Sequence, residues 1–342
     1  MALTAPRTEY ALPYTSGVAA ETDAIRDRLR AVVPDLEWRL FAPYIAAINR
    51  LKVERNAVIL AHNYQSPEIF HGVADIVGDS LALARAAAAT QASTIVLCGV
   101  HFMAETAKLL NPEKCVLIPD PRAGCSLAES ITADDVRRLR EQYPGLPIVT
   151  YVNTSAAVKA ESDICCTSGN AKEVIESLGV PRVICLPDRY LAANIAKETE
   201  VEIIAWQGSC EVHERFTARD IGTFRSSNPG VTVITHPESP PGVVAASDYS
   251  GSTAGMIDFI KKERPASVVL LTECSMSDNV AVHFPATSFL RACNLCPHMK
   301  RNSLPKILES LRELKYAVEI DPAIAEAARR AVARMLDLQI AR

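Results

Sequence analysis

The sequence predicts an α/β protein built from three αβα domains, each with a parallel sheet, that are related by pseudo-threefold symmetry. Short apolar runs, typical of strands buried on both faces, alternate with helical segments as in βαβ units. The same order of runs occurs three times, and a cysteine closes each pass: Cys125, Cys210 and Cys296 lie 85 and 86 residues apart. Three units of one plan fit a compact assembly better than a long solenoid array.

Composition narrows the class of protein further. The 342 residues, 49% hydrophobic and 22% charged, are typical of a globular protein with two or three domains. The net charge of −4 and the lack of a basic stripe argue against nucleic acid as a partner. No apolar run reaches the roughly 20 residues of a membrane-spanning helix, and residues 1–10 lack a secretory pattern. We therefore expect a cytoplasmic protein that has no membrane partner and keeps its ten cysteines as thiols.

The three units contain the predicted strands and helices in the same order. In the first unit we expect strands at 57–64, 93–99 and 115–120, with helices from residue 80 and around 104–110. In the second we expect strands at 146–153, 182–188 and 202–208, with helices at 168–178 and 190–197. In the third we expect strands at 231–238, 268–273 and 281–287, with a helix at 252–263.

Helical segments flank the three units. Stretches 20–33 and 36–51 precede the first unit, and a helix capped by Asp321 and started by Pro322 follows the third and should cover the first. The predicted division is an N-terminal segment, three domains and C-terminal helices that return to the first domain: 1–53, 54–130, 131–217, 218–302 and 303–342.

Each first strand ends in a polar triplet, whose first and third members point to one face because strand side chains alternate. Ligands bind parallel α/β sheets at the carboxyl ends of their strands. We therefore expect six side chains to meet there: His62, Tyr64, Tyr151, Asn153, His236 and Glu238. A single polar triplet could simply be a strand end that meets water. Because such triplets occur at three equivalent places, a ligand site explains them better.

A hydroxyl residue follows each triplet at a nearly constant distance. Ser80, Ser168 and Thr253 lie 18, 17 and 17 residues after the first triplet members, and each is expected to begin a helix. They can act as plain N-caps. They can also form anion sites for carboxylate or phosphate at the helix N-termini. Both roles are compatible.

The three closing cysteines also occupy equivalent places, so a threefold arrangement brings them to its axis. Three converging thiolates have two functional interpretations, an iron–sulfur cluster or a zinc ion, and His213 or His298 could complete a zinc site. Inert thiols are the third possibility. A cluster held by three cysteines keeps one iron open to substrate, where it can act as a Lewis acid.

Longer motifs identify a known family. The segments AHNYQ, HFMAETAKLLNPEK, PDPRAGCSLAE, YVNTSAAVKAESDICCTSGNA, WQGSCEVHERF, THPES and CNLCPHMKRNSL resemble quinolinate synthase, the A protein of de novo NAD synthesis. The resemblance runs from about Ala57 to Leu304. It implies condensation of iminoaspartate with dihydroxyacetone phosphate to quinolinate, with loss of phosphate and two waters, on one 4Fe–4S cluster at the common interface of the domains.

The resemblance also implies roles for individual residues. Cys125, Cys210 and Cys296 would be the cluster ligands, and Cys293 a neighbour that is not a ligand. Some members have CxxCxxC where Leu290 stands here, and many have a cysteine in place of Ser239.

Glu238 would be the general base and Tyr64 the proton donor, while His62 and His236 bind substrate and relay protons. Tyr151, which also belongs to the catalytic set, would hold carboxylates and phosphate together with Asn153, Ser80, Ser168 and Thr253. The aspartate oxidase that supplies iminoaspartate is a candidate partner.

Two other function classes stay open at this point. One is a zinc-dependent hydrolase or lyase that uses the same three cysteines. The other is a protein without catalytic activity, either an iron–sulfur sensor or an interaction module. The convergent His, Tyr and Glu side chains favour an enzyme, because a scaffold does not need them.

Overall fold

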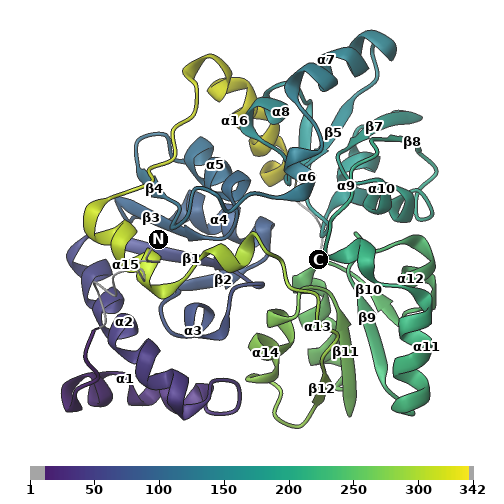
Figure 1. Cartoon of the computed structure of the whole chain (residues 1–342). Helices are drawn as coiled ribbons and strands as arrows, with labels where there is room; N and C mark the ends of the chain where they lie inside the picture. Colours follow the sequence, from purple (N-terminus) through teal and green to yellow (C-terminus); the bar gives the residue numbers. More distant parts are fainter. Residues whose placement is uncertain (1–11, 339–342) are drawn as a thin grey trace, which may run out of the picture.

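The computed structural model describes residues 12–338 and contains three four-stranded, all-parallel sheets. Figure 1 shows the three units around a common centre, with the first in purple and blue, the second in teal and the third in green. The first sheet holds β1 (Ala57–His62), β2 (Ile76–Gly78), β3 (Thr94–Cys98) and β4 (Cys115–Leu117). The second holds β5 (Ile148–Tyr151), β6 (Ile164–Cys166), β7 (Arg182–Leu186) and β8 (Glu202–Ala205). The third holds β9 (Thr232–Thr235), β10 (Tyr249–Ser250), β11 (Ser267–Leu271) and β12 (Ser288–Leu290).

All three sheets have the same strand order. Their orders are β2-β1-β3-β4, β6-β5-β7-β8 and β10-β9-β11-β12, so the first strand of each unit is central and its short second strand is at the edge. The predicted fold class is confirmed. The sequence analysis missed the three edge strands, because runs of two or three residues are shorter than a detectable strand pattern.

Helices cover the sheets, and most of them lie where periodicity predicts a helix. In the first half of the chain they are α1 (Ser16–Leu29), α2 (Asp35–Glu54), α3 (Pro67–Phe70), α4 (Ser80–Ala89), α5 (His101–Leu110), α6 (Ser126–Glu129), α7 (Ala133–Gln142) and α8 (Ala156–Ala160). In the second half they are α9 (Ala171–Ser177), α10 (Arg189–Ile195), α11 (Ala218–Ser227), α12 (Pro241–Ala246), α13 (Thr253–Glu263), α14 (Ser275–Ala281), α15 (Leu304–Glu313) and α16 (Pro322–Asp337). Two single 3-10 turns lie at His213–Arg215 and Met299–Arg301.

Two local predictions are wrong. The strand expected at 281–287 is absent there: α14 ends at Ala281, turns follow, and the strand is β12. Pro285 explains this, since proline cannot donate to a strand ladder. Ser168 does not begin a helix but lies in a turn before α9, and the caps of α4 and α13 are Asp79 and Ser252 rather than Ser80 and Thr253.

The C-terminal helices cover two units rather than one. Helix α15 packs against α2 and β3 of the first unit. Helix α16 packs mostly against α8 and β6 of the second unit and also touches α5 of the first. Its Arg334 donates to the carbonyl of Asp163, and its Arg329 to that of Leu109. The expectation that α16 covers the first unit is therefore only partly right, since the helix bridges two units.

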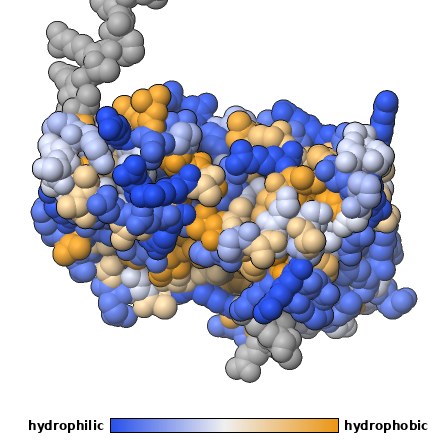
Figure 2. Space-filling view, turned by 90° about the horizontal axis from the view of Figure 1, so that it is seen from below, coloured by the Kyte–Doolittle hydropathy of each residue, from blue (hydrophilic) through white to orange (hydrophobic). Residues whose placement is uncertain are grey.

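One core runs through all three units. The largest apolar cluster includes Leu60 of β1, Val149 of β5 and Ile234 of β9, all fully buried. Burial of large aliphatic side chains stabilises by about 1.5–3 kcal/mol each, so this shared core fixes the units against one another. The face drawn in Figure 2 is mostly hydrophilic, with apolar residues in several separate patches. Within residues 12–338, no helix combines the length and hydropathy needed to cross a membrane.

A repeated aspartate supports each sheet in the same way. Asp75, Asp163 and Asp248 directly precede the edge strands, and their carboxylates accept N–H groups of the central strands at 2.8, 2.7 and 2.7 Å. Each also forms an ion pair with a cation that precedes the central strand: Lys52, Arg140 and Arg225 respectively. The threefold repeat therefore extends to side-chain contacts that the sequence analysis did not use.

Candidate active site

All predicted site residues line one pocket at the meeting point of the three sheets. The pocket holds about 720 Å³ of space that protein atoms do not fill, part of it open to solvent. Its walls include the six triplet side chains, the three hydroxyl residues and the three closing cysteines: His62, Tyr64, Tyr151, Asn153, His236, Glu238, Ser80, Ser168, Thr253, Cys125, Cys210 and Cys296. These residues come from strand ends and from the loops that follow strands, as the rule for parallel sheets predicts.

The three cysteine loops have the same backbone construction. The carbonyl two residues before each cysteine accepts an N–H from the start of a neighbouring helix. These donor–acceptor pairs are His101 to Ala123, Arg189 to Gly208 and Cys274 to Asn294, at 2.7, 2.9 and 3.3 Å. Each cysteine carbonyl in turn accepts the N–H four residues later, from Glu129, Glu214 and Lys300. The loops are therefore equivalent in structure as well as in spacing.

The thiols share one electrostatic environment. Burial raises the pKa of Cys125 to about 12 and also raises the pKa values of Cys210 and Cys296. Backbone N–H groups of the second and third residues after each cysteine oppose this rise in pKa. Such N–H groups stabilise a thiolate, and hydrogen bonds to sulfur are a feature of iron–sulfur ligation. Three convergent thiols with paired N–H donors fit a cluster held by three cysteines.

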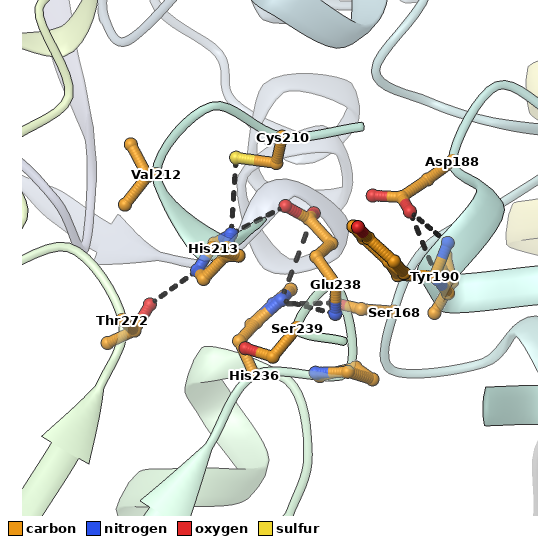
Figure 3. A network of polar contacts seen from close by, with 12 residues as sticks. Ser168, Asp188, Tyr190, Cys210, Val212, His213, His236, Glu238, Ser239 and Thr272 are labelled. Atoms are coloured by element: carbon orange, nitrogen blue, oxygen red, sulfur yellow. Dashed lines mark hydrogen bonds and ion pairs between the residues drawn. The ribbon is translucent and has the colours of Figure 1, made fainter. Parts of the chain in front are cut away.

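A continuous hydrogen-bond chain crosses the pocket wall from Tyr64 to Tyr151. The Tyr64 hydroxyl lies 2.5 Å from the Thr272 hydroxyl, which lies 2.9 Å from Nε2 of His213. Nδ1 of His213 lies 2.8 Å from Oε2 of Glu238, and the Tyr151 hydroxyl donates to Oε1 of Glu238 at 2.5 Å. Figure 3 shows His213 between Thr272 and Glu238, with Cys210 above it.

The direction of the chain follows from the acceptor at its centre. An ionised carboxylate only accepts hydrogen bonds, so Nδ1 of His213 is the donor to Glu238. Its Nε2 then accepts from Thr272, and the Thr272 oxygen accepts from Tyr64. All five residues are less than 10% exposed, so water does not compete for these bonds.

The sequence analysis named His213 only as a possible zinc ligand, and it missed Thr272. His213 follows Cys210 by three residues, which is a signal for a site residue. Thr272 directly follows the apolar strand β11, at the same kind of strand end as the triplets. Its position at a strand end could therefore have predicted that Thr272 belongs to the site.

Burial also sets the protonation of the triplet histidines. It lowers the pKa of His62 to about 4 and that of His236 to about 3, so both rings are neutral near pH 7. Burial raises the pKa of Tyr64 and Tyr151 well above the ordinary value, with Glu238 as a further cause. Burial would also raise the pKa of Glu238, but the hydrogen bonds from His213 and Tyr151 hold it below its ordinary value. The Glu238 carboxylate therefore lies among two neutral histidines and two protonated tyrosines.

Polar contacts connect the hydroxyl residues to the triplets. Ser168 Oγ lies 3.3 Å from Nε2 of His236, and Thr253 Oγ1 accepts from the amide of Asn63 at 2.8 Å. Oδ1 of Asn153 is buried and has no hydrogen-bond partner among the described residues. An unsatisfied amide oxygen in a pocket wall is a place for a donor that the pocket's ligand supplies.

A second candidate metal group overlaps the chain. Ligand atoms of Cys210, His213 and Glu238 lie within 4.8 Å of one another. His298, the other histidine considered for zinc, forms a contact of 3.0 Å with Glu211 of the neighbouring cysteine loop.

Cys293 does not line the pocket. It is joined to Cys274 by a disulfide, with the two Cα atoms 4.7 Å apart. A parallel β-bridge between Glu273 and Asn294, which are the sequence neighbours of the two cysteines, brings Cys274 and Cys293 together. The expectation that all ten cysteines are thiols is therefore wrong for this pair. The disulfide leaves Cys293 without a free thiol.

Comparisons with known proteins agree with the motifs. The profile of the family described as "Quinolinate synthetase A protein" matches residues 46–337. A quinolinate synthase of Agrobacterium fabrum is 66% identical over 330 residues, which cover 96% of each chain. Quinolinate synthase 1 of Mesorhizobium japonicum is 66% identical over 321 residues, 94% of this chain and 99% of its own. A quinolinate synthase of Xylella fastidiosa is 68% identical over 292 residues, 85% of this chain and 86% of its own. With most of its length matched at this identity, the chain belongs to the quinolinate synthase family, whose product serves NAD biosynthesis.

Proposed function

We propose that this chain condenses iminoaspartate with dihydroxyacetone phosphate, forming a new C–C bond, and releases quinolinate, phosphate and two waters. The observation that carries the proposal is the pocket itself. Three equivalent cysteines share its wall with the Glu238 carboxylate, the neutral rings of His62 and His236, and two tyrosines. Family membership supports a reaction that forms quinolinate, and the pocket offers groups for each kind of step that we propose.

Cys125, Cys210 and Cys296 would hold one 4Fe–4S cluster. Their support is equivalent in all three loops, and N–H groups are directed at each thiol. When bound, such a cluster supplies one open iron as a Lewis acid for hydroxyl and carboxylate oxygens.

Glu238 is the proposed base that removes a proton from carbon during enolisation of the triose. It is the carboxylate that the hydrogen bonds of His213 and Tyr151 keep ionised. Tyr64 is the proposed donor to a leaving hydroxyl, because its raised pKa keeps the phenol protonated. The hydrogen-bond chain through Thr272 and His213 links Tyr64 to Glu238. A proton taken up by Glu238 can therefore return to Tyr64 along this chain between steps.

Anionic groups of the substrates would bind opposite the cysteines. Ser80 and Thr253 are the first residues of α4 and α13, where free backbone N–H groups favour anions. His62, His236, Ser168, Tyr151 and Asn153 add neutral donors for carboxylates and phosphate. A cytoplasmic location and a complex with the aspartate oxidase that makes iminoaspartate belong to the same proposal.

A zinc enzyme is the second candidate, and the group of Cys210, His213 and Glu238 is the observation that favours it. Anaerobic metal and acid-labile sulfide analysis of the purified protein separates the two candidates. We expect about four irons and four sulfides per chain, together with quinolinate formation from the two substrates under argon. Zinc without sulfide would refute the cluster, and an iron–sulfur protein that forms no quinolinate would refute the reaction.

A further inference from the structure

Three buried side chains outside the pocket bind the main chain on both sides of a pocket residue. We call Lys159, Asn194 and Asn279 the loop clamps. Each is at most 4% exposed, and none lines the pocket. None was singled out by the sequence, and the proposed chemistry does not use them.

Asn194 of α10 clamps the loop that carries Glu238. Its Nδ2 donates to the carbonyl of Pro237 and to the carbonyl of Ser239, both at 2.9 Å. These are the residues directly before and after Glu238. Both N–H bonds of one amide are therefore spent on fixing the peptide groups that flank the carboxylate.

Asn279 of α14 clamps the loop that carries Tyr64 in the same way. Its Nδ2 donates to the carbonyl of Asn63 at 3.1 Å and to that of Gln65 at 2.7 Å. Tyr64 lies between these two residues. The backbone on both sides of Tyr64, the first residue of the hydrogen-bond chain, is thus held by a second amide clamp.

The two amide clamps are equivalent by the threefold repeat. Asn194 and Asn279 lie 85 residues apart, the same spacing that separates Tyr151 from His236. Helix α10 belongs to the second unit and clamps the third, while α14 belongs to the third and clamps the first (Figure 1). Each clamp therefore ties one unit to the catalytic loop of the next.

The second-unit loop that carries Asn153 has no amide clamp from the first unit. The equivalent position on α5 is Thr106, whose hydroxyl donates to Phe102 of its own helix. Lys159 of α8, which belongs to the second unit itself, holds this loop instead. Its ammonium donates to the carbonyl of Val152 at 2.8 Å and also to that of Thr154, so it flanks Asn153.

The contacts of Lys159 are those of a clamp rather than of an ion pair. It is fully buried, and among the described residues no carboxylate lies within ion-pair distance of it. Its nearest aromatic contact is the Phe102 ring of the first unit, 5.4 Å from Nζ. Burial of an ammonium costs free energy, which the two carbonyls and the ring partly offset.

The two amide clamps bind through their side-chain nitrogens only. Oδ1 of Asn194 and Oδ1 of Asn279 are buried without a hydrogen-bond partner among the described residues. Leaving a buried oxygen unpaired costs about 1–3 kcal/mol. Among the described residues, both side-chain amides therefore form hydrogen bonds only with the loop.

We propose that the loop clamps are positioning residues for the reaction. Each holds one pocket side chain in place by fixing the peptide groups on both sides of it. The expected kinetic roles rest on the proposed function, because they follow from a base, a proton donor and a substrate-binding amide. The positioning itself does not depend on it.

The test uses full-length variants that remove the donors but keep the volume: Asn194→Leu, Asn279→Leu and Lys159→Met. Misplacement of reacting groups by about 1 Å can cost up to about a hundredfold in rate. We expect the two Asn variants to lower kcat by about tenfold or more with little change in KM. Lys159→Met should instead raise KM by about tenfold, since Asn153 holds substrate.

The matched control is Thr106→Val, which removes a buried hydroxyl at the equivalent position that carries no clamp. It should leave kcat and KM within about twofold of the parent. Parallel losses of kcat in all four variants, in proportion to their lowered melting temperatures, would reduce the clamps to ordinary packing residues. Unchanged kinetics in the three clamp variants with full iron content would refute the proposal.

Crystal structures give a readout that does not need the reaction. In Asn194→Leu the Glu238 carboxylate should move by about 1 Å or more, while in Thr106→Val it should not move. If the parent protein forms no quinolinate, the proposed function fails, and these structures still decide the positioning. An unmoved carboxylate in Asn194→Leu would overturn the positioning whatever the activity.

Discussion

The residues that support the three sheets are repeated from unit to unit, whereas most side chains of the pocket between the sheets are not. The supports are repeated: an aspartate before each edge strand and an identical backbone pattern in each cysteine loop. Apart from the cysteines and the hydroxyl residues Ser80, Ser168 and Thr253, the pocket side chains are not repeated. The triplets carry His and Tyr in the first unit, Tyr and Asn in the second, and His and Glu in the third.

The difference shows how a symmetric scaffold makes an asymmetric site. Symmetry brings three cysteines to one place, as a single metal centre requires. Different residues at equivalent strand ends then place one carboxylate opposite two tyrosines. The loop clamps belong to both regions, since two follow the repeat and the third departs from it.

The largest loss of activity should come from replacing one of the three equivalent cysteines. In Cys125→Ser, Cys210→Ser and Cys296→Ser we expect iron, sulfide and quinolinate formation to fall to background, because each loop supplies one of three ligands. Cys293→Ser is the matched control, since it lies outside the pocket and should keep about four irons. A cluster that survives loss of any one of the three would break the equivalence of the loops.

The next largest effect should come from the asymmetric part. Glu238→Gln keeps the shape of the side chain but removes the base, so kcat should fall by about 10²–10⁴-fold. The iron content should stay at that of the parent, because the three cysteines are untouched. Full turnover with an intact cluster would refute the assignment of Glu238 as the base.

Sequence reasoning reached the repeated features best, because repetition itself is the signal. The strand-end triplets and the three cysteines could be found from spacing alone, and the cysteines line the pocket together with the first and third member of each triplet. The edge strands could not, since a run such as Tyr249–Ser250 has no periodicity to detect. The strand expected at 281–287 failed because an apolar run that contains Pro285 cannot form a strand ladder.

Features without a repeat or a local pattern were out of reach. The bond from His213 to Thr272 joins residues far apart in sequence, and only the fold brings them to 2.9 Å. The Cys274–Cys293 disulfide depends in the same way on two loops that meet. Lys159 looked like an ordinary helix residue, because nothing near it in the sequence marks a buried ammonium.

A smaller effect should come from the repeated supports, and it should be on stability rather than rate. Asp163→Asn and Asp248→Asn remove the same carboxylate from two units. Each carboxylate binds one backbone N–H and one arginine while it is partly exposed. We expect each change to lower the free energy of unfolding by about 1–2 kcal/mol, measured by urea denaturation, with kcat within about twofold. Clearly unequal losses would show that the units do not share their support.

The smallest effect concerns a position where the three units differ without touching the pocket. Counted back four residues from the aspartate that supports each sheet, the equivalents of Lys159 are His71 and Val244, so a clamp, a histidine and an aliphatic residue occupy this place. Burial lowers the pKa of His71 to about 4, and the facing His283 adds to this, with Arg28 also nearby. The unfolded chain binds a proton near pH 6.5, whereas the folded chain does not until about pH 4.

Stability from a neutral His71 is therefore fully present above pH 6.5 and is lost as the pH falls from 6.5 to 4. After allowance for its partial exposure, the loss attributable to this residue should be about 1–2 kcal/mol. In His71→Leu, urea denaturation between pH 7 and pH 4.5 should show a shallower fall in unfolding free energy than in the parent. Val244→Ala is the control, because it removes bulk at the equivalent position without a titratable group, and its pH slope should match the parent's. An unchanged slope in His71→Leu would mean that this ring protonates freely in the folded protein, and that the pH dependence comes from other groups.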